Sequence, residues 1–339
     1  MIRELDPSAF PNSLPLIGHC PMHGTPTADL ENEISSNKPP FVRWVLLLGI
    51  LLPPACLVLA MVLAWQRGFS GVDLALLVGM YLSTGYGITI GFHRYFAHKS
   101  FDAPKPVVFM LGLLGSMAMQ GPIFWWVATH RCHHQHSDED LDPHSPYAPG
   151  DHGMFRGFWH AHMGWLFRPS TDPVDRYVPD LKAQPMLRWL DAHFVWWALL
   201  GIAIPAVIGG LVTMSWWGAL TGGLWGGVIR IMVEHHATWS VNSICHIWGA
   251  QPYESHDESR NNAVVGVIAL GEGWHNNHHA FPTSARHGLR WWQFDSSWMI
   301  IRLMQCLRLV SNVKTPTPER MEQRRRSPRS SALISASSE

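Results

Sequence analysis

Long apolar stretches with almost no charge are the feature that most constrains how this chain can fold. The first covers residues 41–65 and carries only Arg43, near its start. A helix of about 20 apolar residues crosses the ~30 Å hydrocarbon core of a bilayer, so this stretch is long enough to span a membrane. Three later stretches have the same character and cover residues 74–92, 194–214 and 216–233. The sequence therefore predicts four transmembrane helices.

The composition agrees with a membrane protein that also has a water-facing part. Hydrophobic residues make up 47% and charged residues 15% of the chain, against about 25% charged residues in soluble domains. The formal net charge is zero, so no bulk attraction to nucleic acid is expected. We therefore expect membrane lipids as surroundings and no nucleic-acid partner.

Short connections join the four predicted helices into two hairpins. Because each hairpin returns the chain to its starting side, both tails and the long segments after each hairpin share one side of the membrane. Lys38, Arg43 and a run of arginines at 324–326 lie on that side. The linker on the other side carries Arg67. Basic residues favour the cytoplasmic side, so the termini and the long segments are expected in the cytoplasm.

The expected fold is all-α: an integral protein of the cytoplasmic membrane, with four transmembrane helices in two hairpins and a cytoplasmic helical cap. The predicted membrane domain covers residues 41–310, and residues 93–193 and 234–310 form its cap. Residues 1–40 and 311–339 are expected to be disordered tails, the second of them basic. A GHCPMH cluster in the first tail could bind a metal or haem, and a flexible tail is the alternative.

One further apolar stretch, residues 107–128, carries no charge and is long enough to cross a membrane. If it did so, the histidine clusters before and after it would lie on opposite sides of the bilayer. We therefore expect a buried or interfacial helix, broken near Gly121 and Pro122. The weaker apolar run at 263–270 is too short to span.

Three histidine clusters carry the chemical signal of the sequence. They are His93-Arg-Tyr-Phe-Ala-His98, His130-Arg-Cys-His133-His134 and His275-Asn-Asn-His278-His279. In the last two, positions i, i+3 and i+4 share one helical face, so three imidazoles of a cluster could converge. His93 and His98 lie roughly 140° apart on an ideal α-helix, so they are expected to straddle a helix end or to face different metals. Each cluster follows an even number of predicted crossings, which places all three on one side.

This number of clustered histidines indicates a metal site. Imidazole ligands suit iron, copper, nickel or zinc, and a structural zinc needs only four ligands, so the eight clustered histidines imply two metal ions. Ferritin-like di-iron sites use two Glu-x-x-His pairs and two further glutamates. The clusters contain one such spacing, from Glu272 to His275, so a ferritin-like site is not expected. Two histidine-bound irons beside a membrane favour activation of O2 against a lipid C–H bond, which side chains alone do not break.

Four longer stretches surround the histidines and cover the chain from about residue 85 to 295. They are GFHRYFAHKSF, HRCHHQHSDEDLDPHSP, TWSVNSICHIWG and GEGWHNNHHAFP. In this order they resemble the membrane fatty acid desaturase family, and closely its acyl-CoA delta-9 (stearoyl-CoA type) branch in bacterial form. The resemblance implies an oxidoreductase that uses two iron ions, O2 and external electrons to convert a saturated fatty acyl chain into a cis-monounsaturated product.

The resemblance also implies which residues hold the metals and the substrate. Nine histidines match the iron ligands of the family: His93, His98, His130, His133, His134, His246, His275, His278 and His279. Asn242, four residues before His246, matches a position that reaches one iron through water. Trp126, Thr238 and Trp239 match residues that line a kinked tunnel for the acyl chain.

Other polar residues near the clusters are expected to support the ligands. A ligand imidazole is commonly oriented through its other N–H, and the candidate partners are Asp138, Asp140, Asp142, Glu272 and Asn276. Five histidines outside the family pattern are interpreted as supporting or surface groups: His136, His144, His162, His235 and His236. Thr129 stands where eukaryotic members carry an acidic residue, and the basic residues that contact CoA have no clear match. The acyl carrier therefore stays open between CoA, a lipid headgroup and acyl carrier protein.

The remaining expectations concern partners and rival functions. No cytochrome b5 segment is visible in the sequence, so electrons are expected from a separate donor such as ferredoxin, or a cytochrome b5-like protein, with its reductase. The nearest alternative function is a di-iron membrane hydroxylase of alkanes, sterols or carotenoids. A metal transporter or sensor is an alternative of another class, but a transporter is expected to carry ionisable ligands deep in its spans. No charged residue lies deep within the predicted spans, and Arg230 lies near the end of one. The sequence therefore disfavours a transporter.

Overall fold

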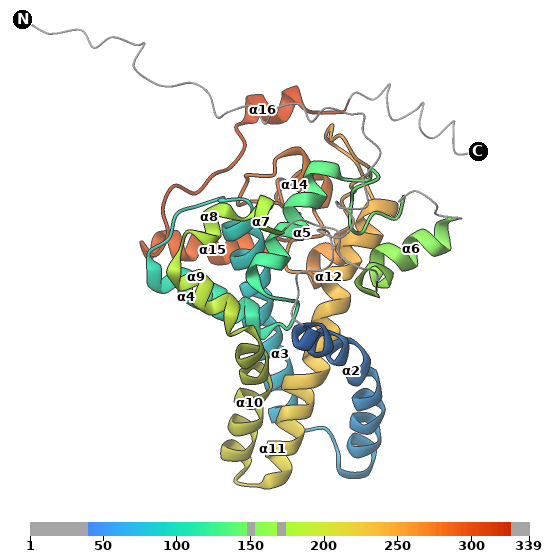
Figure 1. The fold of residues 1–339 in the computed structure, drawn as a ribbon, viewed down its shortest axis with the longest axis vertical. Coiled ribbons are helices and arrows are strands. Elements are labelled where there is room, and N and C mark those ends of the chain that lie inside the picture. The colour runs from blue at the N-terminus through green and yellow to red at the C-terminus, as the bar shows by residue number, and fades with distance from the viewer. Residues whose placement is uncertain (1–39, 148–152, 168–173, 327–339) are drawn as a thin grey trace, which may run out of the picture.

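The computed structural model describes residues 40–147, 153–167 and 174–326. Over these ranges the chain is helical, with isolated bridges and no strands. Long helices form one end of the molecule and a cap of shorter elements forms the other (Figure 1). The predicted all-α fold is thus confirmed for the described part of the chain. The N-terminal GHCPMH cluster lies outside the described residues.

The long helices come from two parts of the chain. The N-terminal part comprises α2 (Pro40–Arg67), α3 (Gly71–Tyr86) and the π-helix η1 (Gly87–Ala97). The later part comprises α10 (Phe194–Thr213), α11 (Trp216–Gly222), the π-helix η3 (Gly223–Ile229) and α12 (Arg230–Ile247). The last three of these follow one another without a break and form one rod.

Shorter elements build the cap. Between η1 and α10 lie α4 (Lys105–Met117), α5 (Ile123–His136), α6 (Met154–His162), η2 (Gly164–Phe167), α7 (Val174–Tyr177), α8 (Pro179–Lys182) and α9 (Pro185–Ala192). After α12 lie α13 (Ala263–Ile268), α14 (His275–Ala280), α15 (Ser296–Cys306) and α16 (Pro318–Gln323).

Three helices are long and apolar enough to cross a membrane by length and composition: Leu47–Gln66, Gly71–Ala97 and Phe194–Thr213. They correspond to three of the four predicted spans. The fourth, residues 216–233, is helical as predicted, but five glycines, three tryptophans and Arg230 make it less apolar than the others. The structure therefore supports three spans, and the fourth remains a prediction.

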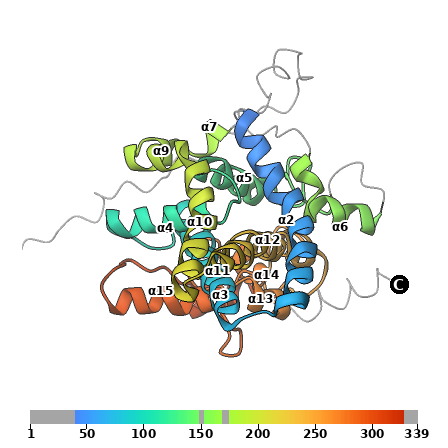
Figure 2. The same cartoon turned by 90° about the horizontal axis from the view of Figure 1, so that it is seen from below.

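The two predicted hairpins pack differently. α10 turns directly into α11 at Met214, and the two helices lie against each other. α2 instead packs against η3 and α12, where Ala60 contacts Leu224 and Ile229. The rod of α11, η3 and α12 therefore separates most of α2 from α3 (Figure 1), and Figure 2 shows the same arrangement from below. Pro53 lies inside α2, which bends along its length, as a helix-interior proline predicts.

Glycines let α10 and the neighbouring rod approach closely. Gly218, Gly222 and Gly226 are spaced four apart and all face α10, the small-xxx-small spacing that brings membrane helices together. A Cβ on Gly222 would lie 2.4 Å from the carbonyl oxygen of Pro205. A side chain at this position therefore requires the two helices to separate.

The apolar stretch at 107–128 is divided between α4 and α5. The break lies at Gly121, whose φ is 119°, and at Pro122, the N-cap of α5. The backbone N–H of Phe124 donates to the carboxylate of Asp191 in α9, at 2.8 Å. This bond gives a partner to one of the N–H groups that a helix start leaves unpaired. The predicted break near Gly121 and Pro122 is confirmed.

Residues 311–326 follow the surface of the cap, which differs from the disordered tail predicted from residue 311. Ser311 and Asp102 exchange backbone hydrogen bonds of 2.8 and 2.9 Å. Further along, Arg324 donates to the carbonyl oxygen of Ala280 at 2.7 Å. These backbone partners hold the segment in place. Residues 327–339 lie outside the described residues.

The close approach at Gly222 gives a stability test. Gly222→Ala should destabilise the protein by about 1–3 kcal/mol, because overpacking forces backbone shifts. The measurement is the thermal unfolding midpoint of the purified protein in detergent. Gly79→Ala is the matched control, since a Cβ there meets no atom within 4 Å. Equal midpoints for the two variants would contradict the close packing of Gly222 against Pro205.

Candidate metal centre

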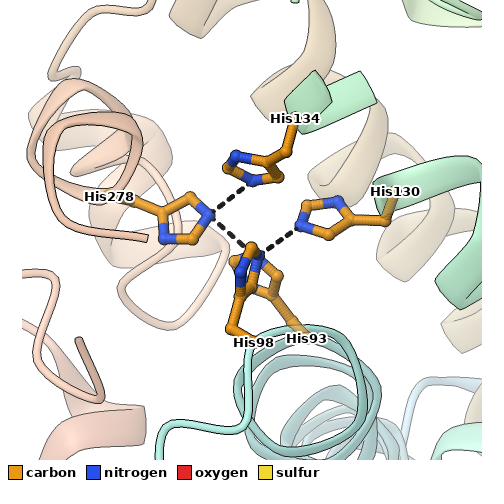
Figure 3. A group of neighbouring side chains, drawn as sticks. All are labelled: His93, His98, His130, His134 and His278. Carbon is orange, nitrogen blue, oxygen red and sulfur yellow. Dashed lines mark hydrogen bonds between the residues drawn. The ribbon is translucent and has the colours of Figure 1, made fainter. Parts of the chain in front are cut away.

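The nine histidines predicted as ligands come together at the cap end of the long helices. They are carried by η1 and its C-cap, by α5, by α12 and by α14. Their ring nitrogens form two groups, and within each group all potential ligand atoms lie within 4.8 Å of one another. The first group is His93, His98, His130, His134 and His278 (Figure 3). The second group is His133, His246, His275 and His279.

In the first group the Nε2 atoms point at one another (Figure 3). Nε2 of His278 lies 3.0 Å from that of His93 and 2.8 Å from that of His134. Nε2 of His98 lies 2.7 Å from that of His130. Five imidazole nitrogens thus meet in one small volume, as ligands around a single ion would.

The second group has the same character and lies beside the first. Nε2 of His133 is 3.4 Å from that of His279, and Nε2 of His246 is 3.1 Å from that of His275. The ring of His134, from the first group, stacks on His279 with their centroids 4.3 Å apart. The two groups are therefore immediate neighbours.

Adjacent histidines of one cluster join different groups, so the expectation that three imidazoles of a cluster converge is wrong. His133 belongs to the second group and His134 to the first, and His278 and His279 divide in the same way. Consecutive residues of an α-helix point about 100° apart, so a His-His pair reaches two sites at once. Each HxxHH cluster therefore ties the two groups together.

A π-helix brings His93 and His98 into the same group. The backbone N–H of His98 donates to the carbonyl of His93 at 3.1 Å, the i to i+5 bond that defines a π-helix. Residues five apart then lie close to one turn apart, and the two rings are 4.8 Å from each other. The two histidines do straddle a helix end, because His98 caps η1, but they do not face different groups.

Carboxylates hold the outer nitrogen of four of these histidines. Nδ1 of His93 lies 2.6 Å from Glu272, and Nδ1 of His133 lies 2.9 Å from Asp142. Nδ1 of His246 lies 2.9 Å from Asp138, and Nδ1 of His279 pairs with Asp257. A carboxylate beside Nδ1 keeps the ring proton on that atom and leaves Nε2 with a bare lone pair. This is the tautomer that binds a metal through Nε2.

The donor set fits a cation better than a cluster of hydrogen bonds. Nε2 of His133 and Nε2 of His279 face each other although both rings carry their proton on Nδ1. Two bare lone pairs repel, whereas a metal ion between them satisfies both. Burial, with the nearby imidazoles, holds the pKa of His98, His130 and His134 well below the ordinary 6.5. These rings are therefore neutral, which is the form that binds metal.

Arg94, which directly follows His93, ties the first histidine cluster to the C-terminal part of the cap. The guanidinium is fully buried. It donates to Glu272 at 3.2 Å, to Asp295 at 3.0 Å and to the carbonyl oxygen of Ala285 at 2.8 Å. Because Glu272 also holds His93, one buried ion-pair network positions both the ligand and the loop beside it.

Arg131, which directly follows His130, connects α5 to the end of η1 and to α8. Its guanidinium donates to the carbonyl oxygens of Phe96 and Ala97, at the end of η1, and to both carboxylate oxygens of Asp180. These carbonyls would otherwise lack the partners that a helix end needs. The sequence analysis did not single out these two arginines. The signal that could have done so is the His-Arg dipeptide, which occurs in both clusters.

Three of the five residues predicted to support the ligands do so: Asp138, Asp142 and Glu272. Asp140 is exposed. Asn276 exchanges hydrogen bonds with the backbone of Tyr253 and so fixes a loop. Asp257 was not predicted, because it lies in an irregular loop that has no periodic pattern.

Of the five histidines outside the family pattern, His144 packs against a predicted ligand, and the contacts of the other four are with residues outside the two groups. The ring centroid of His144 lies 4.4 Å from that of His133, and His136 lies 3.6 Å from Glu139. His162 and His236 contact each other at 3.0 Å. Nε2 of His235 lies 3.1 Å from the carbonyl oxygen of Met119. A sixth, His287, was not predicted. It is buried, and its Nδ1 lies 3.2 Å from Glu272.

Two cavities meet beside the histidine groups, and they share four lining residues: Trp126, His130, Thr238 and Asn242. The first cavity continues past Trp239, Trp165 and Ile50. The second continues between α3 and α12, past Ile88, Ala237 and Leu270. All four residues predicted for the substrate tunnel and the water contact therefore line a cavity, and all of them except Trp239 line both.

Gln120 holds the junction of the two cavities together. Its amide donates to the Thr238 hydroxyl at 2.8 Å, and it accepts from the indole N–H of Trp126 at 3.3 Å. Nothing in the sequence pattern singled out this residue. Thr129 lines the first cavity as well, and its buried hydroxyl has no hydrogen-bond partner among the described residues.

Comparison with known proteins gives one family. Residues 71–305 match the family model described as fatty acid desaturase. An sn-1 stearoyl-lipid 9-desaturase of Anabaena variabilis is 38% identical over 83% of this chain and 97% of its own. A hex-5-enoyl-[acyl-carrier protein] acetylenase of Moorena producens is 40% identical, over 81% and 87% of the two chains. An acyl-CoA C20 Delta5-desaturase of Anemone leveillei is 40% identical, over 68% and 70%.

The pairing of Asp257 with His279 gives a test of metal binding. Asp257→Asn removes the charge that fixes the tautomer of His279, so the affinity for metal should fall roughly 10–100-fold. The measurement is the metal content of the purified protein by elemental analysis. Asp175→Asn is the matched control, because Asp175 is exposed and pairs with Lys182, not with a histidine. An unchanged metal content in Asp257→Asn would contradict this role.

Proposed function

Because this chain belongs to the fatty acid desaturase family, we propose that it is an O2-dependent di-iron enzyme that introduces a cis double bond into a saturated fatty acyl chain. The observation that carries the proposal is the position of the two histidine groups, at the place where two cavities meet. An acyl chain that passes from one cavity into the other would run beside both groups.

Iron is the metal that we propose for both groups. The nine histidines of the two groups are the proposed ligands. Asn242 is proposed to reach the second group through water, since it lies four residues before His246 on α12. Iron bound there supplies the activation of O2 that breaking an unactivated C–H bond requires.

The cavities account for how an acyl chain would be positioned. Apolar side chains such as Ile88, Val241 and Leu270 line the second cavity, which suits a hydrocarbon chain. Trp126 and Thr238 lie at the junction, held by Gln120. A chain fixed there presents only certain carbons to the histidine groups, and such positioning is what sets the site of reaction. Trp239 extends this wall into the first cavity.

We place the double bond at carbon 9 of an acyl chain carried on CoA or on a lipid. The resemblance of the histidine motifs to the delta-9 branch supports the position, as does the name of the Anabaena relative. The names of the three relatives include a lipid, acyl carrier protein and CoA as carriers. Product analysis measures the position of the double bond, and feeding acyl chains on defined carriers distinguishes the carriers.

The proposed electron donor is a separate protein, ferredoxin or a cytochrome b5-like protein with its reductase. We propose that the enzyme lies in the cytoplasmic membrane with its cap in the cytoplasm. The excess of basic residues on that side of the predicted topology supports this orientation.

The first test is fatty acid analysis in a desaturase-deficient host that expresses the full chain. The wild-type protein should produce a monounsaturated acid with one defined double-bond position. His133→Ala and His278→Ala should each abolish the product while leaving membrane insertion intact, because each removes a member of one group. His193→Ala is the control, since His193 belongs to neither group and its Nδ1 contacts the carbonyl oxygen of Trp189 in α9. Activity retained in either of the first two variants would count against the proposal.

A second test concerns the junction of the cavities. Gln120→Leu removes both hydrogen bonds that hold Trp126 and Thr238, so the acyl chain should shift by about an ångström and the turnover should fall by up to roughly 10²-fold. The products should also spread over neighbouring double-bond positions, measured by mass spectrometry of derivatised acids. Iron content should stay unchanged. A single unshifted product at full rate would show that Gln120 does not position the chain.

A further inference from the structure

The far end of the second cavity is polar, which a hydrocarbon chain does not require. From the histidine groups this cavity extends to Tyr81, Gly85 and Glu234. Glu234 lies eight residues before Asn242 on α12, about 12 Å along the helix. The cavity therefore passes from the proposed reaction site, between apolar walls, to a carboxylate.

Glu234 is 3% exposed, and only one of its two carboxylate oxygens contacts donors of the protein. Oε2 lies 2.7 Å from the hydroxyl of Thr84 and 3.2 Å from Nη1 of Arg230. Arg230 is fully buried and also donates to the carbonyl oxygens of Met117 and Gly201, both at 3.1 Å. The carboxylate is therefore held in a fixed position by helices α3, α4, α10 and α12.

The other oxygen, Oε1, has no hydrogen-bond partner in the part of the chain that the structure describes. Glu234 lines the second cavity, and a Cβ added to Gly85 on the opposite helix would lie 3.9 Å from Oε1. Oε1 thus lies toward Gly85 of α3, and both residues line the cavity. A carboxylate that served only to neutralise Arg230 would be expected to place both oxygens against donors of the protein.

An unsatisfied buried oxygen costs free energy unless a donor reaches it. The methyl end of an acyl chain cannot provide one. The geometry points to a hydroxyl-binding subsite at the end of the acyl cavity, with Oε1 of Glu234 as the acceptor. This inference rests on the proposed function, because it takes the second cavity as the place of the acyl chain.

The O–H group at this subsite has two possible sources. One is a water molecule that stays at the end of the cavity, in which case Glu234 limits the length of the acyl chain. The other is a hydroxyl on the acyl chain itself, in which case Glu234 selects a hydroxylated substrate. Both sources use the same hydrogen bond to Oε1, and the experiment separates them.

The experiment uses the full chain in a desaturase-deficient host. The cells are fed a graded series of saturated acids and, separately, the same acids with a hydroxyl on the terminal carbon. Glu234→Leu removes the acceptor. Because it leaves Arg230 buried without its partner, the double variant Arg230→Leu with Glu234→Leu is tested as well, since replacing a buried pair by apolar residues keeps folding intact more often than removing one member. Ser83→Ala is the matched control, since it removes a hydroxyl from the neighbouring residue of α3 that donates to the carbonyl oxygen of Gly79 and does not line the cavity.

The readout is the ratio of products, which does not depend on total activity. With a held water, the variants without Glu234 should favour longer saturated chains by about tenfold or more over the wild type. With a substrate hydroxyl, the wild type should prefer the hydroxylated acids, and the same variants should lose that preference. Ser83→Ala should resemble the wild type in both series.

Two outcomes oppose the inference, and they are distinct from a failure of the proposed function. If the variants without Glu234 desaturate with the same product ratios as the wild type in both series, the subsite does not exist. If Ser83→Ala changes the ratios as much as Glu234→Leu, the effect does not come from Oε1. A wild-type protein that desaturates no acid at all would instead overturn the proposed function.

Discussion

The hydrogen bond between an imidazole Nδ1 and a carboxylate is the interaction on which this structure depends. Four of the nine clustered histidines make it, and it fixes the proton on the outer side of each ring. Without that constraint, imidazoles this close together could pair with one another through N–H groups and form an ordinary polar core. With it, bare lone pairs are directed to two points, and the site becomes specific for cations.

The fold serves this constraint by holding short segments against one another. The π-helix η1 aligns His93 with His98, and each HxxHH cluster contributes to both groups. Arg94 connects these segments through buried hydrogen bonds to a carbonyl oxygen and carboxylates, and Arg131 does so through partly buried ones. Removing one member of such a buried network leaves the others unpaired, so the cost exceeds that of one bond.

The sequence predicted the helical class, the break at Gly121 and the histidines that come together, and three of its four predicted membrane spans are helices of membrane length. Each of these follows from a local pattern: hydropathy over one segment, a glycine-proline pair, or a cluster of one residue type. It did not predict that His93 and His98 join the same group, because the segment expected to follow α-helical geometry is a π-helix. The division of each HxxHH cluster between the two groups depends on how the helices pack, which the cluster alone does not record. Asp257, His287 and Gln120 were missed for a related reason. Single polar residues in loops or at helix ends become partners only through tertiary contacts, which no local pattern records.

The same constraint links metal binding to the folding of the cap. His275, His278 and His279 lie on α14, which has six residues, and a helix this short is not stable alone. Asp257 lies in an irregular loop. Buried lone pairs without partners oppose folding, so the free energy of metal binding becomes free energy of folding for this region. The long helices are different, because glycine contacts such as Gly222 against Pro205 hold them together without metal. Removal of a metal bound to these groups would therefore loosen the cap, while the packing of α10 against its neighbouring rod would persist.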